Sequence, residues 1–310
     1  MDPLAVYGLN IVVYIGIFAI VALSLNLEYG FTGLGNFGKV AFYMVGAYSY
    51  ALLSQAEIHF ILALILSAII AGLFGLLVSL PAIRLREDYL AIVTLAFGEI
   101  LRIIVKSEDW IANGIWGITI SPAINIEGAA YEVGVLINIG LVFACLAICF
   151  IFAQMLANSP FGRIMRAIRE DDIAADSLGK NRTKYKALVF MLGSAMAGLG
   201  GALFAQYVGY IDPQIFLPLL TFTIWIMVIL GGPANNWGVV IGAALVLIFE
   251  RGTAIIKDYI TLPIDPNNVQ YILFGVLIIL ILLFRPSGLF KESKIKTLGT
   301  KKAIKWMDRS

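Results

Sequence analysis

Residues 33–40 have the glycine and lysine spacing of a phosphate-binding loop. The segment reads Gly33-Leu34-Gly35-Asn36-Phe37-Gly38-Lys39-Val40. A true phosphate loop also needs a hydroxyl side chain after the lysine and a preceding β-strand. Val40 has no hydroxyl, and a long apolar run precedes the segment. We therefore expect no bound nucleotide or other cofactor, and predict a glycine-rich break at which the chain enters its second membrane segment.

A similar segment interrupts the apolar sequence much later in the chain. Asn36 and Gly38 recur as Asn236 and Gly238, and each pair follows two glycines. Repeated, interrupted helices are typical of transporters, in which the breaks line the substrate site. Ordinary turn chemistry is the alternative explanation. If the breaks line the path, cysteines placed at Asn36 and Asn236 should react with polar thiol reagents in at least one transport state.

Few charged side chains interrupt the apolar runs. Glu99 precedes Arg102 by three residues, which places both on one helix face. A charge at the centre of a membrane helix costs about 2.5–3.5 kcal/mol, so we expect Glu99 to be paired or protonated. A structural pair with Arg102 is favoured over a role in proton coupling. Glu28 and Glu250 stand near the ends of runs and are expected at the membrane interface. The candidate translocation-path residues are Asn36, Gly38, Thr94, Glu99, Asn236 and Gly238.

The composition excludes most other classes of protein. Of the 310 residues, 60% are hydrophobic and 14% are charged, and the mean hydropathy is +0.92. A water-soluble domain cannot bury that much apolar surface. The net charge of +2 provides no basic field for nucleic acid. His59 is the only histidine and Cys145 and Cys149 are the only cysteines, so we expect neither a metal centre nor a catalytic site.

Continuous apolar runs identify the fold class. They are too long and too uniform for the alternating strands of a membrane barrel. We therefore predict an all-α, polytopic bundle of about 8–10 transmembrane helices in the lipid bilayer. The runs cover residues 4–27, 31–53, 58–80, 89–105, 133–156, 187–209, 217–231, 237–256 and 269–284. In the sixth run, small residues at four-residue spacing predict close helix packing, namely Gly193, Ala197, Gly201 and Ala205.

Basic residues predict the orientation. Of the 22 lysines and arginines, 7 lie in residues 157–186 and 8 in residues 285–310. Positive loops face the cytoplasm, so both segments are expected there, together with Arg84 and Arg86. Segment 106–132, with its acidic residues and with Trp110 and Trp116, is then expected outside. The N-terminus is expected outside as well, in a plasma-membrane protein.

The loop 157–186 is predicted to hold a helix that does not cross the membrane. Ser159 and Pro160 suit its first positions, and Gly179 suits its end, which predicts a single helix of about 16 residues. Arg166 and Glu170 are spaced to form an ion pair on this helix. Its partly apolar face needs a partner in the cytosol.

Two alanines followed by a glycine give this loop a family resemblance. Ala174, Ala175 and Gly179 match the ATPase-docking helix of ABC importer permeases, although Ile173 stands where an acidic residue is usual. The chain also resembles branched-chain amino-acid permeases of the LivM type in several blocks in order, residues 88–100, 159–171, 209–213, 230–238 and 284–289. Lys39 departs from this pattern, because the family often has a histidine there. The ATPase-coupling residues implied are Arg169, Glu170, Asp172, Ala174, Ala175 and Gly179.

The resemblance implies a function and a set of partners. Residues 1–290 would form the permease domain, which includes the coupling loop 157–186, and residues 291–310 a basic cytoplasmic tail. The partners implied are a second, LivH-type permease, two ATP-binding subunits that use the ATP, and an extracytoplasmic substrate-binding protein. The substrates would be leucine, isoleucine and valine. Two alternatives are an ABC permease for urea, amides or other small polar solutes, and an ion-coupled secondary transporter that relies on acids such as Glu99.

Overall fold

The computed structural model describes residues 3–83, 85, 87–120, 131–257 and, near the C-terminus, 272, 275–276, 279–280, 283–285 and 287–292. The described part is almost entirely helical, which confirms the predicted all-α class. In chain order its elements are α1 (Pro3–Leu25), η1 (Asn26–Gly30), α2 (Lys39–Gln55), α3 (Phe60–Ala82), α4 (Glu87–Ser107), α5 (Asp109–Ala112), η2 (Gly114–Trp116), β1 (Ile118–Thr119), α6 (Tyr131–Asn158), α7 (Pro160–Glu170), α8 (Asp172–Ser177), α9 (Arg182–Val208), β2 (Tyr210–Ile211), α10 (Pro218–Gly231) and α11 (Asn236–Lys257).

Several helices have the length and composition of membrane spans. Among the described residues, four qualify, namely Val6–Gly30, Phe60–Pro81, Val133–Asn158 and Arg182–Val208. Helix α10 is apolar but shorter. The run 31–53 does not form one continuous helix, because residues 33–38 are not helical and α2 starts at Lys39. Most of the run 269–284, together with Arg84 and Arg86, lies outside the described residues.

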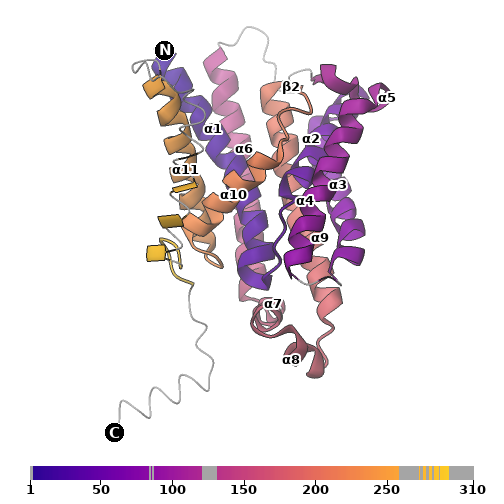
Figure 1. The fold of residues 1–310 in the computed structure, drawn as a ribbon. Coiled ribbons are helices and arrows are strands. Elements are labelled where there is room, and N and C mark those ends of the chain that lie inside the picture. Colours follow the sequence, from indigo (N-terminus) through magenta and orange to yellow (C-terminus); the bar gives the residue numbers. More distant parts are fainter. Residues whose placement is uncertain are drawn as a thin grey trace.

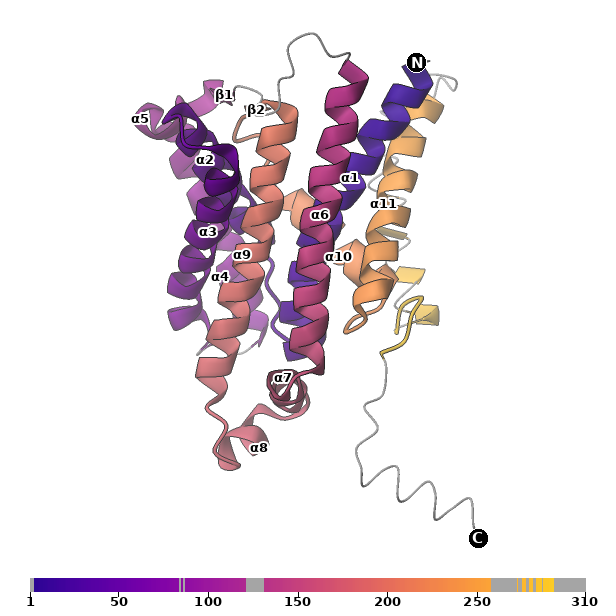
Figure 2. The same cartoon turned by 180° about the vertical axis from the view of Figure 1, so that it is seen from behind.

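The long helices form two groups that meet at α1 and α9. Helices α1, α6 and α11 lie on one side, and α2, α3, α4 and α9 on the other, in both views (Figures 1 and 2). Helix α10 runs obliquely between them (Figure 1). The short helices α7 and α8 project from one end of the bundle, and the N-terminus lies at the opposite end. There, β1 and β2 form a small antiparallel ladder that pairs Ile118 with Ile211.

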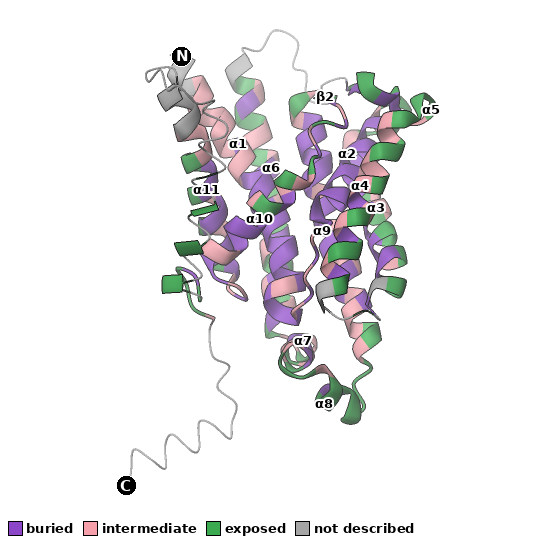
Figure 3. Cartoon of the chain, in the orientation of Figure 1, coloured by how far each residue is buried: buried purple, intermediate pink, exposed green. Residues whose placement is uncertain are grey.

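Burial is concentrated where the two groups meet. The lower part of α1, η1 and the middle of α9 are buried, whereas the outer faces of α3, α4 and α6 are exposed (Figure 3). The exposed side chains on those faces are large and apolar, for example Leu77, Ile92, Ile148 and Met155. An apolar exterior is stable next to lipid, so the pattern fits a membrane-embedded bundle.

Small residues allow α9 to pack closely against α2 and α3. Gly193, Ala197, Gly201 and Ala205 are all buried, which confirms the predicted packing stripe. A Cβ atom at Gly201 would collide with the carbonyl oxygen of Tyr43 in α2. The backbones are therefore in direct contact, and the neighbouring atom cannot move aside as a flexible side chain would.

We predict that Gly201→Ala destabilises the protein. The added methyl group meets backbone rather than a side chain, and such overpacking costs about 1–3 kcal/mol. Gly140→Ala is the matched control, because a Cβ atom at Gly140 in α6 would have no atom within 4 Å. Thermal unfolding of the purified protein in detergent should show a lower midpoint for Gly201→Ala only. Equal midpoints for the two variants would contradict the packing argument.

Candidate functional site

Two helix interruptions lie next to a single π-helical turn. Helix α1 continues into η1, a π-helix whose terminal N–H, from Phe31, bonds to the carbonyl of Asn26. The first break (residues 33–38) follows and contains Gly33 at a φ of +75°. The second break (residues 232–235) separates α10 from α11 and contains Gly232 at a φ of +108°. π-Helical turns are rare and occur mainly at functional sites, which directs attention to this region.

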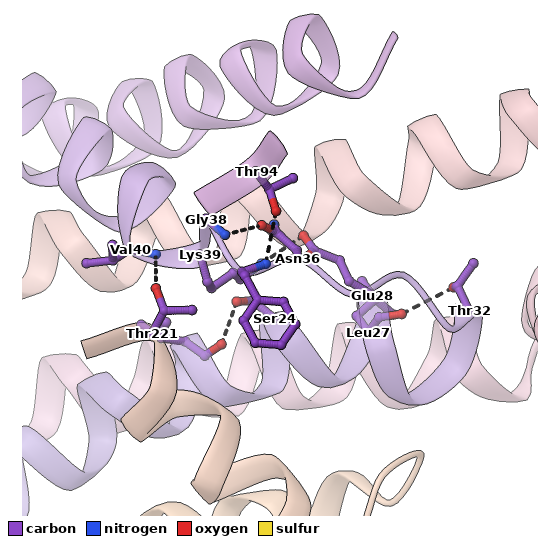
Figure 4. Close-up of polar contacts among 12 residues, drawn as sticks. Ser24, Leu27, Glu28, Thr32, Asn36, Gly38, Lys39, Val40, Thr94 and Thr221 are labelled. Atoms are coloured by element: carbon purple, nitrogen blue, oxygen red, sulfur yellow. Dashed lines mark hydrogen bonds and ion pairs between the residues drawn. The ribbon is translucent and has the colours of Figure 1, made fainter. Parts of the chain in front are cut away.

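A buried carboxylate joins η1 both to the first break and to the start of α2. The Lys39 ammonium donates to Glu28 Oε1 at 2.8 Å, and the Asn36 amide donates to Glu28 Oε2 at 2.9 Å (Figure 4). The side chains of Lys39 and Glu28 are both 0% exposed. The prediction of an interfacial Glu28 is therefore wrong, because the chain folds back at the first break and covers this carboxylate. The absence of a side chain at Gly193 of α9 makes room for the Glu28 side chain. A Cβ atom at Gly193 would lie only 2.8 Å from Glu28 Cγ, which is too close for two carbon atoms.

Side chains of α4 and of the break itself satisfy the backbone of the first break. The Phe37 N–H donates to Thr94 Oγ1 of α4 at 3.1 Å, and the Gly38 N–H donates to Asn36 Oδ1 at 2.9 Å. A Cβ atom at Gly38 would collide with the carbonyl oxygen of Thr94. Because lipid offers no hydrogen bonds, non-helical backbone at membrane depth needs such internal partners.

Helix α10 covers the same break from the other side. The Val40 N–H donates to Thr221 Oγ1 at 3.2 Å, which satisfies one of the free N–H groups at the start of α2 (Figure 4). The indole of Trp225 donates to the carbonyl oxygen of Asn36 at 3.3 Å and stacks on the Phe37 ring at 4.5 Å between centroids. The elements η1, α2, α4 and α10 are thus all linked at the first break.

The same π-turn also holds the second break. The Asn26 amide donates to Asn236 Oδ1 at 2.9 Å, and Asn26 Oδ1 accepts the Ala234 N–H at 2.8 Å. Asn236 donates in turn to Gln154 Oε1 of α6 at 2.9 Å. The Gly238 N–H donates to Asn235 Oδ1 at 3.0 Å, a turn contact like that between Gly38 and Asn36. Asn26 and Glu28, two residues apart in η1, therefore hold one break each.

The structure brings together five of the six candidate path residues. Asn36 and Gly38 lie in the first break and Thr94 contacts it, and Asn236 and Gly238 adjoin the second. Glu99 is separate, on α4, where Arg102 Nε donates to its Oε2 at 2.9 Å, which confirms the structural pair. The sequence reasoning missed Asn26, Gln154 and Thr221, whose only signal is a polar side chain within an apolar run. Both Asn36 and Asn236 are buried by their own chain, and their exposure during transport stays a prediction.

The loop 157–186 holds two short helices instead of one. Ser159 is the N-cap of α7, as predicted, and accepts the Gly162 N–H at 3.3 Å. The predicted single helix is wrong, because Asp171 takes an extended conformation and caps α8. Its carboxylate accepts the N–H groups of Ile173 and Ala174 at 3.0 and 2.9 Å. An aspartate in this position competes with helix continuation, since its side chain replaces the backbone acceptor.

Gly179 ends α8 in the way that its sequence position predicts. Its φ is +76°, and the Lys180 N–H bonds back to the Ala175 carbonyl at 3.1 Å, which closes the helix with a left-handed residue. Two large apolar side chains nearby face solvent, Ile173 at 70% exposure and Leu178 at 80%. Helix α8 therefore presents an apolar surface away from the bundle.

Salt bridges attach α7 and α8 to the rest of the protein. Asp172 accepts from Lys186 at 3.1 Å and from Arg182 at 3.0 Å. Partial burial opposes ionisation of Asp172, but the hydrogen bonds and charges of Lys186 and Arg182 outweigh it and lower the pKa of this carboxyl. The predicted pair of Arg166 with Glu170 is wrong, because Arg166 bonds to Glu292 at 2.9 Å instead.

Comparison with known proteins identifies the family. The family described as "Branched-chain amino acid transport system / permease component" matches residues 7–282. The chain belongs to this permease family. A LivM permease of Methanocaldococcus jannaschii, named as a probable branched-chain amino acid transport protein, is 33% identical over 95% of this chain and 96% of its own length.

Further relatives come from bacteria. LivM of Escherichia coli, a high-affinity branched-chain amino acid transport permease, is 31% identical over 90% of this chain and 68% of its own length. LivH of the same organism is 25% identical over 90% of this chain and 92% of its own length. The permease thus resembles two different components of one transport system. No solved structure matches it significantly.

We predict that Lys39→Met strongly destabilises the permease. The substitution leaves the Glu28 carboxylate buried without its cation, and breaking a buried pair in this way costs about 3–5 kcal/mol. Adding Glu28→Gln should restore most of the loss, because the amide still accepts from Asn36. Lys184→Met, at an exposed position, is the control. The thermal midpoint in lipid nanodiscs measures the effect, and a double variant no more stable than Lys39→Met would contradict it.

Proposed function

We propose that this permease carries leucine, isoleucine and valine into the cell as part of an ABC importer. The observation that supports this most is its similarity, over nearly the whole chain, to LivM proteins named as branched-chain amino acid permeases. The two breaks joined by η1 give the fold what transport needs, namely irregular polar backbone at membrane depth. An aliphatic amino acid requires an apolar path with a few polar groups for its zwitterion, and the breaks offer both.

The end of the bundle that carries α7 and α8 faces the cytoplasm in this proposal. The loop 157–186 holds 7 of the 22 basic residues, and segment 287–292 lies at the same end (Figure 2). Positive segments are retained on the cytoplasmic side, so the N-terminus at the opposite end would be outside. Trp110 and Trp116, which are strongly exposed at that opposite end, suit an outer membrane interface.

Energy would come from subunits other than this chain. Two ATP-binding subunits would hydrolyse ATP, and one of them would dock on α8 through the exposed Ile173 and Leu178. A LivH-type permease would complete the path, and an extracytoplasmic binding protein would deliver the amino acid. The chain itself needs no cofactor under this proposal, since residues 33–40 contain the first break and a lysine that is already paired with Glu28.

Reconstitution tests the proposed function. The tagged permease is purified with the subunits that accompany it and placed in liposomes with ATP inside, and uptake of radiolabelled leucine is measured. We expect uptake that depends on ATP and is inhibited by excess isoleucine or valine. Inhibition by urea or amides alone would favour the related class of permease. Uptake driven by an ion gradient in vesicles that hold only this chain would overturn the proposal.

Replacing Gly179 should uncouple transport from ATP hydrolysis. The left-handed conformation at the end of α8 resists a β-branched residue, so Gly179→Val distorts the surface that would meet the ATPase. We expect much lower leucine uptake from a protein that still inserts in the membrane. Gly179→Asn is the matched control, because asparagine tolerates this conformation. Normal uptake by Gly179→Val would contradict the docking assignment.

A further inference from the structure

Helix α7 contacts the first break directly. The guanidinium of Arg169 donates to the carbonyl oxygen of Gly30, the last residue of η1. Its side chain also lies against the start of the break, since a Cβ atom at Gly33 would be 3.3 Å from Arg169 Cγ. Arg166, one turn earlier, lies over the ring of Phe31 at 5.0 Å from the centroid. Any displacement of α7 therefore acts on the backbone that connects η1 to the first break.

A C-terminal segment covers the second break. The Leu289 N–H donates to the Leu230 carbonyl at 2.8 Å, and the Phe290 N–H donates to the Gly231 carbonyl at 3.2 Å. The Asn235 amide donates to the carbonyl of Lys291 at 3.0 Å. These bonds satisfy the carbonyl groups at the end of α10 and fix residues 287–292 onto the break.

Glu292 connects this segment to α7. Its Oε1 accepts from Arg166 Nε at 2.9 Å, and its Oε2 accepts from Arg169 Nη2 at 2.7 Å. The three side chains are 13–29% exposed, so water and salt screen the bonds less than at an open surface. The Arg169 guanidinium thus holds Gly30 and Glu292 at once, which the compact ammonium of a lysine cannot do in the same planar geometry.

We infer that Arg169 and Glu292 are positioning residues that make both helix breaks follow the movement of α7. Arg169 reaches the first break through Gly30, and Glu292 reaches the second break through segment 287–292. The inference rests on the proposed function for the source of that movement, which is ATP binding in a partner subunit. It assigns a role to a C-terminal segment that lies outside the family's docking helix.

Hydrogen–deuterium exchange of the assembled complex tests this linkage without reference to the substrate. Trapping the wild-type complex with a non-hydrolysable ATP analogue should alter exchange at both breaks. In Glu292→Gln the change at residues 232–235 should disappear, and the change at residues 33–38 should remain. Arg169→Lys should remove the change at residues 33–38. Glu57→Gln, an exposed glutamate at the opposite end, should behave as wild type.

Transport provides the second readout. We expect Glu292→Gln to raise the ATP consumed per leucine imported about fivefold or more, a usual size for lost coupling between two sites. The amount of ATPase subunit that co-purifies should not change. If Glu292→Gln fails to accumulate, Arg169→Lys, which keeps the charge, allows the same comparison.

The outcomes separate this inference from the proposed function. If the ATP analogue alters exchange at residues 232–235 in Glu292→Gln as much as in wild type, the inference is overturned. An equal fall in hydrolysis and uptake overturns it as well. A wild-type complex that imports no leucine but shows the exchange changes contradicts the proposed substrate and supports the linkage. The double variant Glu292→Gln, Arg169→Lys should also be measured. Its fold increase in ATP consumed per leucine imported should be smaller than the product of the two single increases, because Arg169 and Glu292 bond to each other.

Discussion

Irregular backbone inside a bilayer must find its hydrogen-bond partners within the protein, and much of this structure follows from that requirement. The Thr94 hydroxyl satisfies an N–H group of the first break, and the Thr221 hydroxyl satisfies one at the start of α2 that follows it; the two threonines come from two other helices. The second break is satisfied by the amide of Asn26. Polar residues in otherwise apolar helices are therefore concentrated around the two breaks, and each of these side chains specifies which helices must meet there.

The π-turn η1 provides the common support. Its two polar side chains, Asn26 and Glu28, point to different breaks although they are two residues apart. The ion pair between Glu28 and Lys39 adds little net stability, because the cost of burying two charges offsets their attraction. Removing either partner is nevertheless costly, so the pair holds the first break in one position relative to α1.

The cytoplasm-facing end proposed here divides its tasks between two short helices. Helix α7 turns Arg166 and Arg169 toward the bundle, whereas α8 presents Ile173 and Leu178 to solvent. The two helices separate at Asp171, which follows the last residue of α7 and whose carboxylate caps the first turn of α8. One helix is thus available to a partner while the other stays attached to the breaks, an arrangement suited to transmitting displacement.

The sequence by itself determined the membrane class, the helical content, the glycine break at residues 33–38 and the caps at Ser159 and Gly179. These depend on local chemistry, namely apolar run length, glycine conformation and side-chain capping. It did not predict the buried Glu28, the partner of Arg166 or the two-helix loop. Those depend on which segments far apart in the chain come together, as with Arg166 and Glu292. Only the tertiary structure decided them, because a charged side chain takes the partner that folding brings within reach and not the one spaced along its own helix.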